Sequence, residues 1–340
     1  MSADSPTADR MLEIVVPASR GDELHTLLDG EGVAASWLLT ENSEIAVWKA
    51  AVTSQGVEEV MDALDEAFSG DDQFRVILYA LEATLPRFEA PEQNGSEKKP
   101  QRVSRAELYE DVAGSAALTR MYLAQVVLAT VVAAVGLGRD NTAVVIGAMV
   151  IAPLLGPNIA LALGTTLGDA GLIRRAAKTA AVGVGIAMGL SLVVGMVAPI
   201  DLESREIVSR SDVGSMDIVL ALASGAAGSL AFTTGVSTAL VGVMVAIALL
   251  PPTVATGVLL GAGEVELGIG ALLLLGINVV CVNLAAVVTF LLQGIRPARW
   301  WEAERSKRAT RRALMFWAGS LLLLGGLMVL YTVLTGERME

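Results

Sequence analysis

The chain has 340 residues, of which 54% are hydrophobic, and a mean hydropathy of +0.60. A soluble globular domain does not carry that much apolar content, so the composition indicates a membrane protein. The net charge of −12 comes mostly from the first third of the chain, which argues against nucleic acid or anionic lipid as the partner of that part. One cysteine, Cys281, and one histidine, His25, exclude a disulfide framework and most zinc or histidine-based catalytic sites.

Residues 1–88 predict a soluble α+β domain with the ferredoxin-like order β-α-β-β-α-β. The strands are rich in β-branched and aromatic residues, and the second helix repeats its apolar residues at the helical period. The N-terminal stretch has no apolar core of a signal peptide, so we expect this domain to lie in the cytoplasm. The expected strands cover 11–16, 33–39, 45–52 and 74–81, and the expected helices cover 19–30 and 57–68.

Residues 89–103 combine proline, glycine and charged side chains with almost no apolar content, which is typical of a linker. The pattern Ser104-x-x-Glu107 follows and is a capping-box signature. It predicts a connecting helix over residues 104–120 that leads into the membrane part of the chain.

The remaining sequence predicts a transmembrane domain over residues 121–335 with seven spans, each close to the length that crosses a bilayer. Lysine and arginine are concentrated in every second connection, which predicts a cytoplasmic N-terminus and an outer C-terminal tail at 336–340. We therefore expect a multi-pass protein of the bacterial cell (inner) membrane. The expected spans cover 121–138, 143–166, 176–199, 216–234, 237–262, 267–293 and 313–335.

A near-repeat relates the two halves of this domain. The segment at 145–164 (VIGAMVIAPLLGPNIALALG) is matched about 95 residues later by 240–259 (LVGVMVAIALLPPTVATGVL). Spans one to three would then correspond to spans four to six. Because three is odd, the two units would cross the membrane in opposite directions, which predicts a 3+3 inverted-topology repeat with one extra helix.

Proline interrupts both copies of the repeat, and matched interruptions are the best sequence pointer to a transporter binding site. Pro153 and Pro157 bracket one expected break, and Pro251 and Pro252 mark the other. A helix restarting after each break would direct free amides and about half a positive charge toward the membrane centre, which suits an anion. The alternative is that both are ordinary proline kinks. The other candidate site residues are Gly147, Gly156, Asn158, Thr253, Asn278 and Asn283.

Two further features of the membrane half each allow two interpretations. Arg205 and Arg210 could recruit an anion to an outer vestibule, or they could form a solvated ion-pair network. Three small-residue patterns are expected to bring helices together, with pore lining as the alternative, namely Gly185–Gly189, Gly257–Gly261 and Gly225-x-x-x-Ser229.

Several motifs in this half resemble the integral-membrane family known as domain of unknown function 389. The resemblance covers roughly residues 115–295. It implies a polytopic bacterial membrane protein and adds no established reaction. The motifs that carry it are IGAMVIAP (146–153), Gly168-Asp169, SREIVSR (204–210), ALASGAAGSLA (221–231) and AIALLPP (246–252).

The sequence thus favours a secondary transporter or channel for a small, anionic solute, with its site at the midplane between two proline-broken helices. The alternative is a membrane-anchored sensor or scaffold whose soluble domain binds a small metabolite or a partner protein. No enzyme, cofactor or metal site is expected, because phosphate-loop, dinucleotide, metal-ligand and nucleophile motifs are all missing from the sequence. The expected partners are the lipid bilayer, a small solute or ion, and further copies of the chain in a homo-oligomer.

Overall fold

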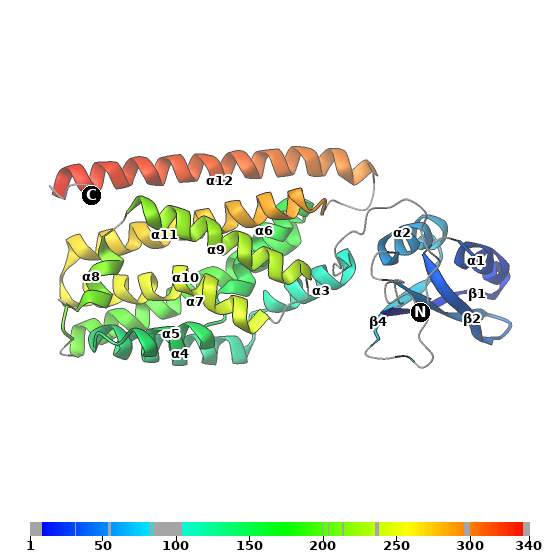
Figure 1. Ribbon diagram of the computed structural model, residues 1–340, viewed down its shortest axis with the longest axis horizontal. Coiled ribbons are helices and arrows are strands. Elements are labelled where there is room, and N and C mark those ends of the chain that lie inside the picture. Colours follow the sequence, from blue (N-terminus) through cyan, green and yellow to red (C-terminus); the bar gives the residue numbers. More distant parts are fainter. Residues whose placement is uncertain are drawn as a thin grey trace, which may run out of the picture. The chain divides into compact units, whose positions relative to one another are not determined.

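The computed structural model divides the chain into two compact units, Met1–Glu107 and Leu108–Glu340 (Figure 1). It describes residues 9–30, 32–53, 56–81, 84, 104–198, 200–202, 204–212, 214–234, 238–295 and 300–335. The predicted linker at 89–103 and the predicted tail at 336–340 lie outside these residues.

The first unit is a four-stranded antiparallel sheet with helices between its strands. Its strand order is β2-β3-β1-β4, and the predicted sequence of strands and helices is confirmed. A short 3-10 turn, Ala18–Arg20, precedes the first helix. The elements are β1 (Arg10–Pro17), α1 (Gly21–Leu28), β2 (Val33–Glu41), β3 (Ile45–Val52), α2 (Val57–Phe68) and β4 (Arg75–Ala80).

Alternation along β1 explains how this sheet holds its helices. Leu12, Ile14 and Val16 are completely buried, while the residues between them are only partly buried. Successive side chains on a strand point to opposite faces, so these three share one face of the sheet. Leu24 of α1 and Phe68 of α2 belong to the same buried cluster, so the apolar stripes of both helices cover that face.

The helix α3 (Arg105–Ser115) begins with the predicted capping box. The backbone N–H of Ser104 donates to Glu107 Oε2 at 3.0 Å, and the backbone N–H of Glu107 donates to Ser104 Oγ at 3.2 Å. Arg10 on β1 donates from Nε to the other Glu107 oxygen, Oε1, at 2.9 Å. The start of α3 is therefore fixed both by its own cap and by the sheet of the first unit.

The second unit is helical. Among the described residues, four helices are long and apolar enough to cross a membrane, and the pair α5–α6 makes a fifth span if it counts as one. Shorter apolar stretches occur at Leu249–Ala262 in α10 and at Met315–Tyr331 in α12, which runs along one side of this unit (Figure 1). The helices are α4 (Arg120–Gly138), α5 (Thr142–Ile151), α6 (Leu155–Leu167), α7 (Ala170–Val197), α8 (Arg205–Ser211), α9 (Ser215–Thr234), α10 (Thr238–Ala262), α11 (Val265–Leu292) and α12 (Trp300–Thr335).

Glycine brings two pairs of these helices into close contact. A Cβ atom added to Gly257 of α10 would lie 2.5 Å from Ser191 Cβ of α7, and one added to Gly225 of α9 would lie 2.5 Å from the Val282 carbonyl oxygen of α11. The predicted packing role of these two patterns is confirmed. The same role predicted for Gly185 and Gly189 is not seen within the chain, because no described atom lies within 4 Å of a Cβ added to either.

Candidate functional site

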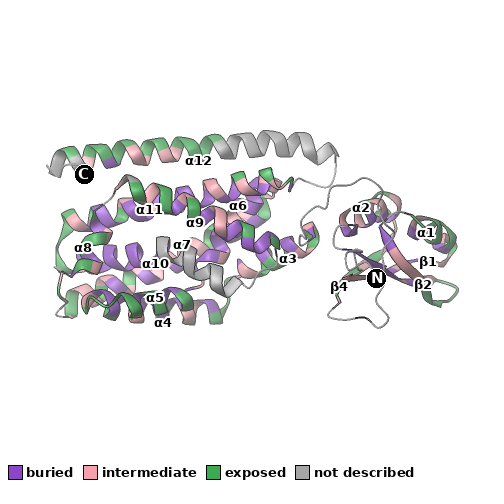
Figure 2. Ribbon diagram, viewed as in Figure 1, coloured by how far each residue is buried: buried purple, intermediate pink, exposed green. Residues whose placement is uncertain are grey.

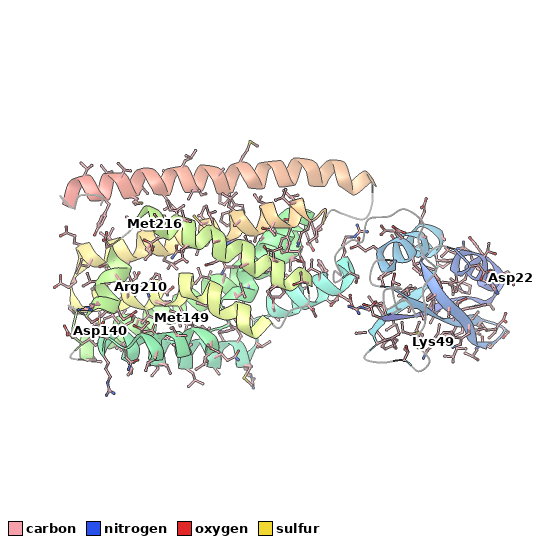
Figure 3. All side chains as sticks on the ribbon, in the orientation of Figure 1. Asp22, Lys49, Asp140, Met149, Arg210 and Met216 are labelled. Carbon is pink, nitrogen blue, oxygen red and sulfur yellow. The ribbon has the colours of Figure 1, made fainter. Side chains whose placement is uncertain are left out.

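The first predicted break is present between α5 and α6, whose axes are bent by 53°. Ala152 has an extended backbone (ψ 119°), as expected for a residue directly before a proline. Pro153 has no N–H, so the carbonyl of Met149, a residue labelled in Figure 3, loses its normal helical partner. The break therefore follows directly from the position of Pro153.

The second half of the broken pair begins earlier than predicted. Helix α6 starts at Leu155, so Pro157 is its third residue and not its first. A proline in the first turn costs no hydrogen bond, because the amides there have no partner within the helix. The N-cap residue is Leu154, and no side chain caps this end of α6. Because Pro157 has no N–H, only the amides of Leu155 and Gly156 can serve a ligand at the positive end of the helix dipole.

Two buried asparagines meet in this region from helices far apart in the sequence. Asn158 is 6% exposed and Asn283 of α11 is 0% exposed. Asn283 Nδ2 donates to Asn158 Oδ1 at 3.0 Å and to the Val279 carbonyl at 2.8 Å. Asn158 Nδ2 donates to the Leu154 carbonyl at 2.9 Å, which ties the pair to the N-cap of α6.

The amide oxygen of Asn283 has no hydrogen-bond partner among the described residues. Its orientation is fixed by the network, because exchanging Oδ1 and Nδ2 would set an oxygen against the Val279 carbonyl and against Asn158 Oδ1. A buried acceptor left unpaired is costly, and the cost is higher where no bulk water is near. This acceptor is therefore the one feature of the amide pair that packing alone does not explain.

Close backbone approaches surround the amide pair. Gly225 lets α9 contact the backbone of Val282, the neighbour of Asn283. On the other side, a Cβ added to Gly156 would lie 2.8 Å from Ser115 Cβ at the end of α3. Two of the contacts that hold the site thus depend on glycine having no side chain.

The second predicted break is wrong. Helix α10 is continuous from Thr238 to Ala262 and contains both Pro251 and Pro252, so neither an interruption nor a restart at Thr253 occurs. The two prolines deprive only the carbonyls of Ile247 and Ala248 of donors. The stretch from Leu249 to Leu259 is buried throughout, and we attribute the continuity of the helix to this surrounding packing, against the local preference for a break.

The other predicted site residues are distributed as follows. Gly147 is exposed on α5, with no described atom within 4 Å of an added Cβ, so it lies away from the amide pair. The buried Thr253 hydroxyl donates to the Leu249 carbonyl of its own helix at 2.7 Å. Asn278 is buried on α11, 5% exposed, five residues before Asn283. The structure thus brings together Asn158 and Asn283, with Pro153, Gly156 and Pro157 around them.

Sequence reasoning missed the direct pairing of Asn158 with Asn283 and the contact of α3 with Gly156. An asparagine in a strongly apolar helix was the only signal for the first. Nothing in the sequence pattern predicts the second, because it depends on where the end of α3 lies in space.

The cluster around Arg210 matches the ion-pair alternative. Arg210 Nη2 lies 3.4 Å from Glu206 Oε2, and the backbone N–H of Glu206 donates to Asp140 Oδ1 at 3.0 Å. Asp140 and Arg210 are labelled at one end of the helical unit in Figure 3. This acid-paired arginine is therefore not counted in the candidate site.

At the α6–α7 connection, Tyr109 of α3 donates from its hydroxyl to Asp169 Oδ2 at 2.7 Å. Asp169 also caps α7, accepting from the backbone of Gly171 at 2.8 Å and Leu172 at 3.0 Å. Partial burial acts to raise the pKa of this carboxyl, but the hydrogen bonds from Tyr109, Leu172 and Gly171 outweigh it and hold the pKa below its ordinary value. The same bond, together with burial, raises the pKa of Tyr109.

The described part of the helical unit contains no buried charge and no cluster of acids, cysteine and histidine that could hold a metal ion. Its buried polar residues are all serine, threonine or asparagine. Figure 2 marks the buried positions of each helix in purple. The candidate site therefore offers amides and a helix terminus, with no charged side chain buried beside them.

These observations define a helical membrane protein with a small N-terminal α+β unit. The chain belongs to the DUF389 family, described as a domain of unknown function, whose family model matches residues 149–284. It is 36% identical over 308 residues to the uncharacterized protein MJ0678 of Methanocaldococcus jannaschii, a match that covers 91% of this chain and 95% of that protein. No solved structure matches the chain.

Proposed function

We propose that the protein is a secondary transporter or channel for a small, anionic solute, which binds at the α5–α6 break beside Asn158 and Asn283. The single observation that carries this proposal is the amide pair, in which one buried oxygen is left without a partner. Amides that serve only to hold helices together are expected to satisfy each other. An acceptor left open beside a helix interruption is the arrangement expected of a binding site.

The helix terminus supports the choice of an anion. The start of α6 has no side-chain cap, so its amides and its partial positive charge are available to a ligand. The continuous α10 removes the second such terminus. The proposal therefore uses one helix start and one amide from α11, and not two equivalent helix starts.

The architecture proposed with this function has seven spans, a 3+3 inverted repeat and a cytoplasmic ferredoxin-like domain, in a multi-pass cell-membrane protein whose C-terminus lies outside. The packing is consistent with the repeat, because α7 packs on α10 and α11 packs on α6. Each third helix of a proposed unit thus contacts the second helix of the other unit. The open face at Gly185 and Gly189 is consistent with the proposed homo-oligomer.

The test is anion flux into proteoliposomes that contain the purified full chain, measured with chloride, nitrate, hydrogencarbonate and phosphate. We expect at least one of these anions to cross faster than in protein-free liposomes. Pro153→Ala restores an N–H to the Met149 carbonyl and is expected to abolish the flux by straightening the break. Equal flux in wild type and Pro153→Ala would place the path elsewhere, and flux of no anion would remove the proposal.

One observation favours the alternative of a sensor or scaffold. Trp37, Lys49, Glu13 and Ile77 are register partners in a row across the four strands, on the sheet face opposite α1 and α2. Trp37 is 36% exposed and Ile77 is 44% exposed. A sheet face that exposes Trp37 and Ile77 on either side of the Lys49–Glu13 ion pair can bind a partner protein. The sensor function is preferred if no solute crosses and Trp37→Lys changes the assembly of the full chain.

A further inference from the structure

The unpaired oxygen of Asn283 limits what the solute can be. An amide oxygen accepts hydrogen bonds and donates none, so the group that completes it must be a hydrogen-bond donor. Asn283 is 0% exposed, and its Nδ2 is already used by Asn158 and Val279. A ligand with only acceptor atoms, such as a halide or nitrate, leaves this oxygen unpaired.

The start of α6 has the opposite requirement. Its uncapped first-turn amides are donors, and the helix dipole adds partial positive charge at the same end. Asn158, which bonds Asn283, lies in the fourth position of this helix and also bonds the N-cap carbonyl of Leu154. The oxygen of Asn283, which needs a hydrogen-bond donor, and the start of α6, which favours an anion, thus lie within about one helical turn of each other along α6.

The charge of the ligand follows from the surrounding residues. In the part of the helical unit that the structure describes, no lysine, arginine or histidine is buried. A helix terminus supplies only about half a charge. A dianion would therefore be poorly compensated in this apolar setting, whereas a monoanion is matched more closely.

We propose that the site selects singly charged oxyanions that keep a proton, such as hydrogencarbonate or dihydrogenphosphate, with the O–H donating to Asn283 Oδ1 and the charged oxygens facing the first amides of α6. This inference rests on the proposed transport function and adds the class of solute to it. The selectivity comes from one amide oxygen and not from a charged side chain.

Hydrogencarbonate and nitrate are the matched probes, because both are planar monoanions and only hydrogencarbonate carries a proton to donate. In proteoliposomes with the full chain, we expect hydrogencarbonate to cross about tenfold faster than nitrate, the ratio that one hydrogen bond to a charged ligand provides. Protein-free liposomes give the background from carbon dioxide permeation. Phosphate is the second probe, and its flux should fall as the solution is made more alkaline and dihydrogenphosphate gives way to the dianion.

Asn283→Leu removes the acceptor and should bring the ratio of hydrogencarbonate to nitrate flux close to one. Thr130→Val is the matched control, since Thr130 is a 0% exposed residue of α4 whose hydroxyl donates to the Val126 carbonyl of its own helix, and it should keep the wild-type ratio. If Asn283→Leu does not fold, the wild-type ratio decides alone.

The outcomes separate the two proposals. Flux of no anion overturns the proposed function. Flux of nitrate equal to that of hydrogencarbonate in wild type leaves the transport function standing and overturns the selectivity. A wild-type preference that Asn283→Leu leaves unchanged also overturns the inference, because the amide then holds only a water molecule.

Discussion

The two proline sites of the helical unit occupy equivalent positions in the sequence repeat but have different structures. Pro153 ends α5 and bends the chain by 53° before α6, while Pro251 and Pro252 lie inside the continuous α10. Ala152 adopts the extended backbone that a proline favours in the residue before it. In α10 the packing on α7 and α11 overrides the same preference. The presence of proline alone therefore does not decide whether a helix of this unit is interrupted.

The largest expected effect tests the close packing of α10 on α7. Gly257→Leu should lower the free energy of unfolding by more than about 4 kcal/mol, because the new side chain meets Ser191 Cβ and the Met188 carbonyl, at 2.5 and 2.6 Å from the Cβ position. Thermal unfolding in detergent measures this. Gly147→Leu on α5 is the control, since its Cβ position is open, and it should be close to neutral.

Next in size is the contrast between the prolines themselves. Pro251→Ala should raise the free energy of unfolding by up to about 3 kcal/mol, because the helix is already continuous there and the new N–H can donate to the Ile247 carbonyl. Pro153→Ala should instead abolish transport without a comparable gain in stability. The two variants are compared by thermal unfolding and flux, and identical behaviour of both would contradict the distinction drawn between the two sites.

A smaller effect measures the amide pair. Asn158→Leu and Asn283→Leu should each cost about 2 kcal/mol of stability, because each leaves the other amide buried with a lost partner. The double variant should cost clearly less than the sum of the two, as measured in a double-mutant cycle. Additive costs would mean that the two side chains do not interact.

The smallest effect concerns the connection outside the membrane. Tyr109→Phe should cost about 1 kcal/mol of stability at neutral pH, because the Asp169 carboxyl loses one of its donors. The pKa of Asp169 is lowered in the folded chain, so its contribution is complete above its ordinary value of 3.8 and is lost as the pH falls through the folded pKa. Unfolding measured from neutral to acidic pH should therefore show a smaller acid-induced loss in Tyr109→Phe than in wild type.

The sequence predicted what depends on local rules. The order of strands and helices in the first unit follows from apolar periodicity, and the capping box at Ser104 and Glu107 forms as its spacing predicts. The break at Pro153 follows from the missing amide of one residue. Each of these features is set by residues close together in the chain.

Features that depend on distant contacts could not be predicted in the same way. Helix α10 is continuous against the local preference of Pro251 and Pro252, so the break predicted from proline alone was wrong there. The pairing of Asn158 with Asn283 joins residues 125 positions apart, and a spacing pattern contains no information about it. The candidate site therefore contains the first predicted break together with Asn283 of α11, and the second predicted break is not part of it.

The most direct test of the account is the water accessibility of the α5–α6 break. Cys281 is the only cysteine, so Ala152→Cys in a Cys281→Ser background places a single thiol at the break. We predict that a charged, membrane-impermeant thiosulfonate reacts with this thiol in membranes and that the transported anion slows the reaction. Gly185→Cys in the same background is the control and is expected to stay unreactive. A thiol at position 152 that never reacts in a protein that transports anions would contradict a solute path through the break.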